Sequence, residues 1–541
     1  MNQVFRPRSW LAAAAFLALV AVTACGGGTP ASNTAKLTRT SLTVLVANLP
    51  SQLDPLRFVA ADSSYGTQLA EAAYAGLLNH DPKKGINGPF TASDLIPELA
   101  VSVTLSSDQK SYRVVLRQGV KSVAGNPLTS ADVQYTFQRV IGSKTTNVND
   151  LKAANVDLKN PVTIIDDHTL DINLTQPSAL LTDVMATGTL VIIDSKEAQA
   201  HATSDDPWAN KWIATHTVGF GAYMVQTFVP NQTLTFVANP NYWRGAPQIK
   251  TWTYKSISDP STRAQAVIAG DADIADQVGI ADIAAAKAAA DKVGVFFVQR
   301  PIDVQMVMNE TDPKMANPLV RRAIALALNR KDLAATFQGY GKEALDCMDS
   351  NLPHPAPDAL LSDQPDITQA KALLAQAGFP NGFSMHIAGT TTAVVTWDAI
   401  SRILQADLQA VGIQVTIDDY ATFAQFAAAR YSKESFVTQQ SSQIADGAYY
   451  LNTFYGSKSG GNLGKYHSAT MDGYITAALN NPPGSTAHDT AVQQGCTLAI
   501  TEQPMVRLAE PPTPEVVSKD LMPWMRNETH GWQRFYFFGE A

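Results

Sequence analysis

The sequence predicts an α/β fold divided between at least two lobes. A chain of 541 residues is too long for one small hydrophobic core. From Val320 onward, apolar residues with helical spacing alternate with short apolar runs that are typical of strands. Such alternation is typical of lobes in which helices cover a sheet.

The first half of the chain is predicted to be rich in strands. Residues 41–47 form an apolar run typical of a buried strand, and Leu53-Asp54-Pro55 ends it. Residues 98–117 predict a hairpin that turns at 107–110, and residues 65–78 have helical spacing. Further strands are predicted at 162–165, 169–174, 221–229 and 233–238.

Helices dominate the predictions for the remaining chain. A Ser/Thr-x-x-Asp start signal at 129–132 predicts a helix through Arg139. Other helices are predicted at 261–269, 280–291, 320–337, 368–377 and 396–411. The strands between and after them are predicted at 383–388, 413–418 and 505–508.

The N-terminus has the features of an export signal. Arg6 and Arg8 precede an apolar run at 10–22, which is too short to cross a bilayer as a helix. The run ends in Val-Thr-Ala-Cys at 22–25, which resembles a bacterial lipobox and implies cleavage before Cys25 and lipidation of that residue. Residues 26–40 then predict a flexible tether. The alternative is a plain signal peptide with an incidental cysteine.

The composition is that of a globular, acidic body. Hydrophobic residues make up 45% and charged residues 16% of the chain. Removing the two signal arginines lowers 40 basic residues to 38 against 48 acidic ones, a net charge of −10. This charge argues against a nucleic-acid partner. Since no other apolar run approaches membrane-spanning length, the protein is predicted to be anchored to the membrane without crossing it.

Two cysteines remain once Cys25 is assigned to lipid. Cys347 and Cys496 are an even pair in an oxidising compartment, which favours a disulfide. Two buried free thiols are the alternative, because free cysteine also packs well in hydrophobic cores.

Six sequence blocks, in family order, resemble the peptide- and nickel-binding family 5 of extracellular solute-binding proteins. One block reads Tyr-Arg-Val-Val-Leu-Arg-Gln-Gly-Val-Lys at 112–121, and Pro-Leu-Thr-Ser-Ala-Asp-Val follows at 127–133. The others lie at 219–223 with 239–245, 262–274, 320–330, 370–383 and 408–415. Together they cover nearly the whole chain after the tether.

The resemblance implies a two-lobed clamp like the type II periplasmic-binding proteins, with an extra subdomain in lobe I. The implied order is signal peptide 1–24, lipidated tether 25–40, lobe I 41–301, lobe II 302–510, and a return to lobe I at 511–541. The extra subdomain is placed near 71–205, and the crossings between lobes near 298–303 and 505–510.

The family's function implies a lipid-anchored receptor on the extracytoplasmic face of the cell membrane. It would enclose a short peptide between its lobes and deliver it to the permease and ATPase of an ABC transporter. A monomer without a cofactor or enzymatic activity is expected.

The resemblance also carries over ligand-binding positions. Asp446 matches the family aspartate that pairs with the peptide α-ammonium, although its place before an aromatic run also fits a helix N-cap. The backbone of Ser442, Gln443 and Ile444 would pair with the peptide main chain, and Tyr449 follows in the same segment. The matching lobe I loop is Phe58, Val59, Ala60, Ala61 and Asp62.

Two departures from the family pattern affect selectivity. The segment lacks the usual Gly-Trp before Ala445 and Asp446, so the aromatic lining of the pocket must differ. Residues 390–394 lack the arginine that binds the ligand carboxylate in dipeptide-selective members. Without this fixed cation, the sequence favours tripeptides to pentapeptides.

Other functions fit these motifs less well. Family members also carry haem, nickel chelates and opines, which leaves uptake of such a ligand as the alternative. A cell-envelope enzyme is disfavoured, because Ser107-x-x-Lys110 falls in a hairpin turn and no nucleophile–base set is visible. The nine histidines show no metal-binding spacing, so no metal site is predicted.

Overall fold

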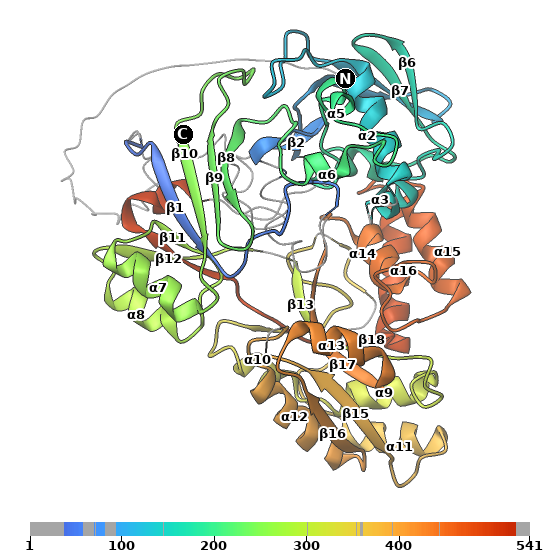
Figure 1. Cartoon of the computed structure of the whole chain (residues 1–541). Coiled ribbons are helices and arrows are strands. Elements are labelled where there is room, and N and C mark those ends of the chain that lie inside the picture. The colour runs from blue at the N-terminus through green and yellow to red at the C-terminus, as the bar shows by residue number, and fades with distance from the viewer. Residues whose placement is uncertain are drawn as a thin grey trace, which may run out of the picture.

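The computed structural model is shown in Figure 1. Its described residues contain four β-sheets, of seven, six, four and two strands, together with helices. The described residues are 37–57, 70, 72–81, 94–143, 145, 147–299, 301–352, 354–357, 361–391, 393–442 and 444–525. Of the helix predicted at 65–78, residues 65–69 and 71 lie outside the described residues, and residues 70, 72 and 73 are helical. The prediction is wrong at its C-terminal end, because Leu78 begins a strand.

The seven-stranded sheet has the order β12-β19-β11-β1-β10-β9-β8. Its strand β1 (Ser41–Val46), predicted from the apolar run, pairs in parallel with β10 (Thr251–Ser256) and β11 (Ile274–Ala275). The other pairings are antiparallel, and the other strands are β8 (Tyr223–Val229), β9 (Thr233–Ala238), β12 (Val293–Phe297) and β19 (Pro514–Ser518). Helices α7 (Pro260–Ala269) and α8 (Asp282–Ala288) lie beside the sheet (Figure 1).

A four-stranded antiparallel sheet and several short helices form a separate layer of the fold. It contains the predicted hairpin β4 (Ala100–Leu105) and β5 (Ser111–Leu116), with β6 (Val162–Asp166) and β7 (Thr169–Asn173). Helix α2 (Ser130–Gly142) starts at the predicted capping box of Thr129 and Asp132. The short helices of this layer are α3 (Val148–Ala153), α4 (Leu180–Val184), α5 (Ser195–Ala200) and α6 (Asn210–Ile213). Strands β2 (Leu78–His80) and β3 (Leu95–Pro97) form the small sheet.

The six-stranded sheet has the order β14-β18-β13-β17-β15-β16. Its strands are β13 (Ile302–Met308), β14 (Lys342–Glu343), β15 (Ser384–Gly389), β16 (Gln414–Asp419), β17 (Ser435–Ser441) and β18 (Met505–Glu510). Its helices include α11 (Ile367–Gln376), α12 (Trp397–Ala410) and α13 (Phe423–Ala429).

The prediction of a single helix at 320–337 is wrong. The chain forms α9 (Pro318–Ala327) and α10 (Arg330–Ala335), separated by an extended Leu328. Asn329 then caps α10 by accepting a hydrogen bond from the Asp332 N–H. A local capping signal therefore interrupts an apolar pattern that continues on both sides of it.

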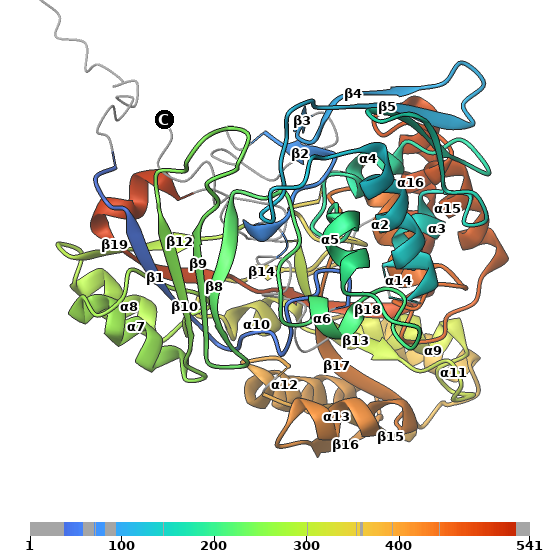
Figure 2. The same ribbon diagram turned by 45° about the horizontal axis from the view of Figure 1, so that its top comes forward.

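Three helices form a further unit: α14 (Gly447–Tyr455), α15 (Ala469–Leu479) and α16 (Thr486–Glu502). Their buried residues join one continuous hydrophobic cluster with those of the four-stranded layer. Figures 1 and 2 both show α3 beside α14 and α15. The disulfide between Cys347 and Cys496, which the sequence favoured, attaches α16 to the segment after β14.

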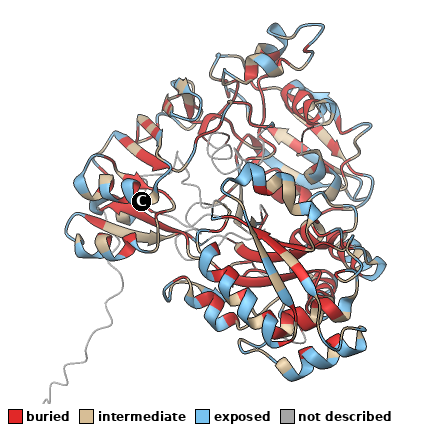
Figure 3. Cartoon of the chain, turned by 60° about the horizontal axis from the view of Figure 1, so that its bottom comes forward, coloured by how far each residue is buried: buried red, intermediate tan, exposed pale blue. Residues whose placement is uncertain are grey.

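The chain passes between the two large sheets twice. It leaves the seven-stranded sheet after β12 and enters the six-stranded sheet at β13, then returns between β18 and β19. The two crossing segments lie side by side, because the Val298 N–H donates to the Thr513 carbonyl at 3.0 Å. The strands next to these crossings, β13, β18 and β19, are buried almost throughout, whereas outer helices keep an exposed face (Figure 3).

Among the described residues, no helix combines the length and the apolar character that crossing a membrane requires.

Candidate functional site

Asp446 lies at the N-terminus of α14 and is only 5% exposed. Its Oδ1 accepts a hydrogen bond of 2.8 Å from the Tyr449 N–H, so the N-cap role considered from the sequence is confirmed. Its Oδ2 lies 3.1 Å from Nε2 of His488. The side chain is therefore a carboxylate held in one orientation in a buried environment.

His488 comes from the first turn of α16, and its ring lies between two carboxylates. Nε2 faces Asp446, and Nδ1 lies 2.9 Å from Oδ1 of Asp489. Burial would lower the pKa of His488, but the hydrogen bonds and charges of the two aspartates outweigh burial and raise the pKa. Contact with the two aspartates therefore favours the protonated form of the His488 ring.

A second carboxyl group, that of Asp183 on α4, lies close enough to Asp446 to respond to its charge. Asp183 is 3% exposed, and its Oδ2 has no hydrogen-bond partner in the structure. Burial and then the negative charge of Asp446 raise the pKa of Asp183 to about 8. Asp183 is consequently mostly protonated at pH 7 unless a cation approaches it.

Tyr449 joins α14 to the neighbouring layer. Its hydroxyl donates to Oδ1 of Asp150 on α3 at 3.1 Å. Desolvation raises the pKa of Asp150 to about 6, although part of its surface remains exposed. A second polar contact between the same units runs from Nδ2 of Asn155 to Oδ1 of Asn480 at 3.2 Å.

The segment before Asp446 is buried and internally hydrogen-bonded. The Ser442 N–H donates to the Pro301 carbonyl at 3.1 Å, and its hydroxyl donates to the Ile444 carbonyl at 2.7 Å. Ser442 and Ile444 are 0% and 3% exposed. The other residues predicted to bind ligand or lipid lie outside the described residues: Cys25, Phe58, Val59, Ala60, Ala61, Asp62 and Gln443.

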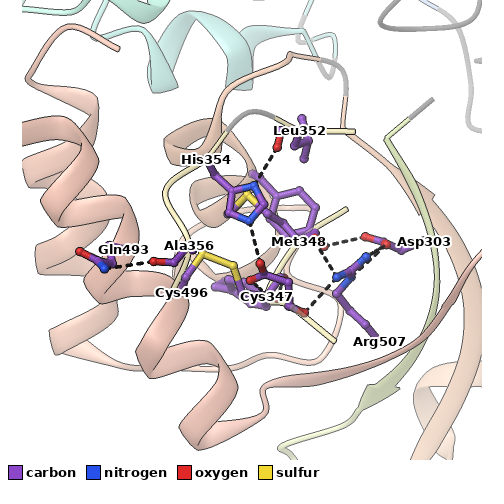
Figure 4. Close-up of a disulfide and its surroundings, with 12 residues drawn as sticks. Asp303, Cys347, Met348, Leu352, His354, Ala356, Gln493, Cys496 and Arg507 are labelled. Atoms are coloured by element: carbon purple, nitrogen blue, oxygen red, sulfur yellow. Dashed lines mark hydrogen bonds and ion pairs between the residues drawn. A yellow bond between two sulfur atoms is a disulfide. The ribbon is translucent and has the colours of Figure 1, made fainter. Parts of the chain in front are cut away.

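The disulfide lies next to a buried ion-pair network (Figure 4). Cys347 and Cys496 have Cα atoms 5.2 Å apart. Beside them, Arg507 forms an ion pair with Asp303 and donates to the carbonyl of Met348 at 2.6 Å. These contacts fix the segment after β14 against both β18 and α16.

Two groups of side chains among the described residues have the spacing of metal ligands. In the first, Asp346, Cys347 and His354, the cysteine is in the disulfide and offers no thiolate. The second consists of Asp303, Asp349 and Glu510, which are all buried.

An open cavity of about 550 Å³ lies elsewhere, between α5, α6 and β8. Its lining includes Trp212, His216 and Phe228, and none of the residues predicted to bind ligand.

Sequence reasoning missed Asp183, Asp150 and His488 as neighbours of the Asp446 segment. Asp183 and Asp150 come from a part of the chain roughly 260–300 residues away, and local patterns carry no signal for such contacts. No spacing motif connects His488 to Asp446, so the sequence gives no reason to pair them.

Sequence comparison finds a matching protein family and related proteins. The family of "Bacterial extracellular solute-binding proteins, family 5 Middle" matches residues 94–462. The glutathione-binding protein GsiB of Salmonella typhi is 26% identical over 509 residues, which cover 90% of this chain and 91% of that protein.

Solved structures show the same fold. The periplasmic binding protein DppA from Helicobacter pylori, in complex with peptide STSA, aligns with a TM-score of 0.78 at 19% identity. That alignment covers 92% of this chain and 97% of the other. The binding protein AgaA from A. tumefacien R10, in complex with agropinic acid, gives 0.75 at 22% identity, with 92% and 98% covered. The predicted two-lobed α/β architecture of periplasmic-binding proteins is confirmed.

Proposed function

Because the chain belongs to the bacterial extracellular solute-binding proteins of family 5, we propose that it captures short peptides for an ABC importer. The expected ligands are tripeptides to pentapeptides, held between the two lobes and passed to a membrane permease. The observation that carries this proposal is the pair of buried carboxyl groups on Asp446 and Asp183.

Asp446 is the proposed partner of the peptide α-ammonium. A buried carboxylate is stable only when it is paired, and in this structure the partner of Asp446 is His488. The Oδ2 atom of Asp183 has no hydrogen-bond partner. An ammonium group at this place would pair with Asp446 and lower the pKa of Asp183 toward ionisation. The buried negative charge of Asp446, which also acts on Asp183, therefore favours a cationic ligand group over a neutral one.

The peptide main chain is proposed to run along the segment that precedes Asp446. In this structure the Ser442 N–H donates to the Pro301 carbonyl and the Ser442 carbonyl accepts from the Ser441 hydroxyl, so these bonds must open before this position can make main-chain contacts with a peptide. Such contacts ignore side-chain identity, which suits a receptor for many peptide sequences. The sequence at 390–394 supplies no arginine to bind a carboxylate at a fixed distance, which supports ligands longer than a dipeptide.

The relatives support a peptide-like ligand. Several curated relatives, GsiB of Salmonella typhi among them, are named for binding glutathione, which is itself a tripeptide with a free α-ammonium. The matched relatives are binding proteins for transport, which agrees with a role as a receptor and not as an enzyme.

Membrane attachment is proposed to occur through lipid on Cys25. The support is the lipobox-like sequence at 22–25 and the apolar run before it. Cys25→Ser should release the protein from the membrane fraction of cells, whereas a protein that stays in that fraction would contradict the lipid anchor.

Native mass spectrometry of the protein, purified without added ligand, tests the proposed ligand class. A receptor with a closed cleft is expected to retain captured ligands, so the result expected is a ladder of added masses that fragment as tripeptides to pentapeptides. A single tetrapyrrole or metal-chelate mass would contradict the peptide assignment and favour uptake of a cofactor.

A further inference from the structure

Three buried carboxyl groups meet where both crossing segments reach the six-stranded sheet. Asp303 lies on β13 beside the first crossing, Glu510 ends β18 beside the second, and Asp349 follows β14. One carboxylate oxygen from each lies within 4.8 Å of the others. Asp303, Glu510 and Asp349 are 1%, 6% and 1% exposed.

The charges of this cluster are incompletely compensated. Among the described residues, only the Arg507 guanidinium forms ion pairs with it, to Asp303 and to Glu510. With all three carboxyl groups ionised, one arginine would leave two negative charges in a buried place, which is unfavourable without further cations. Burial accordingly raises the pKa of both Asp303 and Asp349. The exposed Lys342 reaches Glu510 only through the hydroxyl of Ser350.

Two oxygen atoms at the cluster also have no hydrogen-bond partner in the structure. They are Oδ2 of Asp349 and Oε1 of Gln305. Gln305 is completely buried, and it faces the cluster with its amide nitrogen, because Nε2 donates to Oδ2 of Asp303 at 3.3 Å. Buried polar atoms are nearly always paired, so the unpaired Oδ2 of Asp349 is the oxygen in the cluster that is available to a ligand.

We propose that Asp303, Asp349 and Glu510 bind one calcium ion through their carboxylate oxygens. Carboxylate and amide oxygens are the ligands that Ca²⁺ prefers, at about 2.3–2.6 Å from the ion. Two oxygens bound to one Ca²⁺ therefore lie at most about 5 Å apart, and the cluster satisfies this limit. A divalent ion brings the charge of the cluster with Arg507 to zero.

Calcium fits this place better than magnesium. Mg²⁺ dehydrates reluctantly and usually keeps several water molecules, which a cluster this buried does not accommodate. The bound ion connects Asp303 and Glu510, and so joins the two crossing segments to the chain at Asp349. Calcium would thereby stabilise the region about which the lobes move.

The test uses the whole protein, treated with EDTA and dialysed into calcium-free buffer. Calorimetric titration and elemental analysis are expected to show one Ca²⁺ bound per chain, with Mg²⁺ at least tenfold weaker. Calcium at a hundred times its Kd should raise the Tm by about 2–3 °C. Asp349→Asn should weaken calcium binding at least tenfold, while Asp271→Asn, which changes an exposed aspartate far from the cluster in sequence, should bind like the wild type.

Two results would overturn the proposal. If the wild type binds no calcium and its Tm is unchanged, the cluster is neutralised by protons shared among its carboxyl groups. If Asp349→Asn binds calcium as tightly as the wild type, the calcium site lies elsewhere. The wild-type titration shows whether calcium binds even if the variant fails to fold.

Discussion

Replacing Asp446 by asparagine separates its structural role from the proposed ligand contact. Asparagine is as good an N-cap as aspartate, so the 2.8 Å bond from the Tyr449 N–H to position 446 is expected to persist. The negative charge that faces His488 and the proposed ammonium is lost. Breaking a buried ion pair costs about 3–5 kcal/mol, which corresponds to a roughly hundredfold to several thousandfold weaker Kd.

The assay is calorimetric titration of both proteins with the tripeptide Ala-Ala-Ala, with Tm measured in parallel. Asp366→Asn is the matched control, because Asp366 caps α11 through an equivalent 2.8 Å bond from the Gln369 N–H. We expect the control to bind like the wild type and Asp446→Asn to remain folded but bind far more weakly. Equal affinity of Asp446→Asn and the wild type would refute the role of Asp446 in binding.

Three further predictions concern stability. Burial raises the pKa of Asp183 to about 8 from its ordinary value near 4, so the folded protein binds this proton more tightly than the unfolded chain. Between pH 5 and 8 the free energy of unfolding of the wild type should therefore fall, relative to that of Asp183→Asn, by up to about 1.4 kcal/mol per pH unit. If calorimetry shows the same pH dependence of unfolding for both proteins, this prediction is wrong. Replacing Cys347 and Cys496 by serine opens a 149-residue loop and should lower the free energy of unfolding by about 4–5 kcal/mol in the chain-entropy model, measured in guanidinium chloride; unchanged stability would argue against it. Asp54→Ala leaves its fully buried arginine partner unpaired and should cost about 3–5 kcal/mol in the same assay, whereas Asp171→Ala in a solvent-exposed pair should cost below about 1 kcal/mol; similar losses would show that burial does not set the difference.

Features with a local cause could be predicted from the sequence. The capping box of Thr129 and Asp132 requires only four neighbouring residues, and the structure has both of its hydrogen-bonding partners in place. The hairpin of β4 and β5 follows from alternation and a polar turn within about 20 residues. The disulfide could be predicted because assigning one of the three cysteines to lipid leaves a single possible pair.

Features that depend on distant residues could not be predicted in this way. The α9–α10 break requires knowing that Asn329 caps a new helix instead of continuing the old one. His488 contacts Asp446 across 42 residues, and Asp183 approaches it from another layer of the fold. Periodicity specifies which face of an element is buried, but not which element covers it.

The most direct test of peptide capture compares Ala-Ala-Ala with N-acetyl-Ala-Ala-Ala in calorimetric titrations of the wild-type protein. Acetylation removes the ammonium charge and adds an acetyl group at the same end of the ligand, while the three residues and the carboxylate stay the same. We predict clear binding of the free tripeptide and binding at least a hundredfold weaker for the acetylated one, as expected when a buried carboxylate loses its cationic partner. Equal affinity for both, or no binding of either while a tetrapyrrole or metal chelate binds, would contradict a peptide receptor that recognises the α-ammonium.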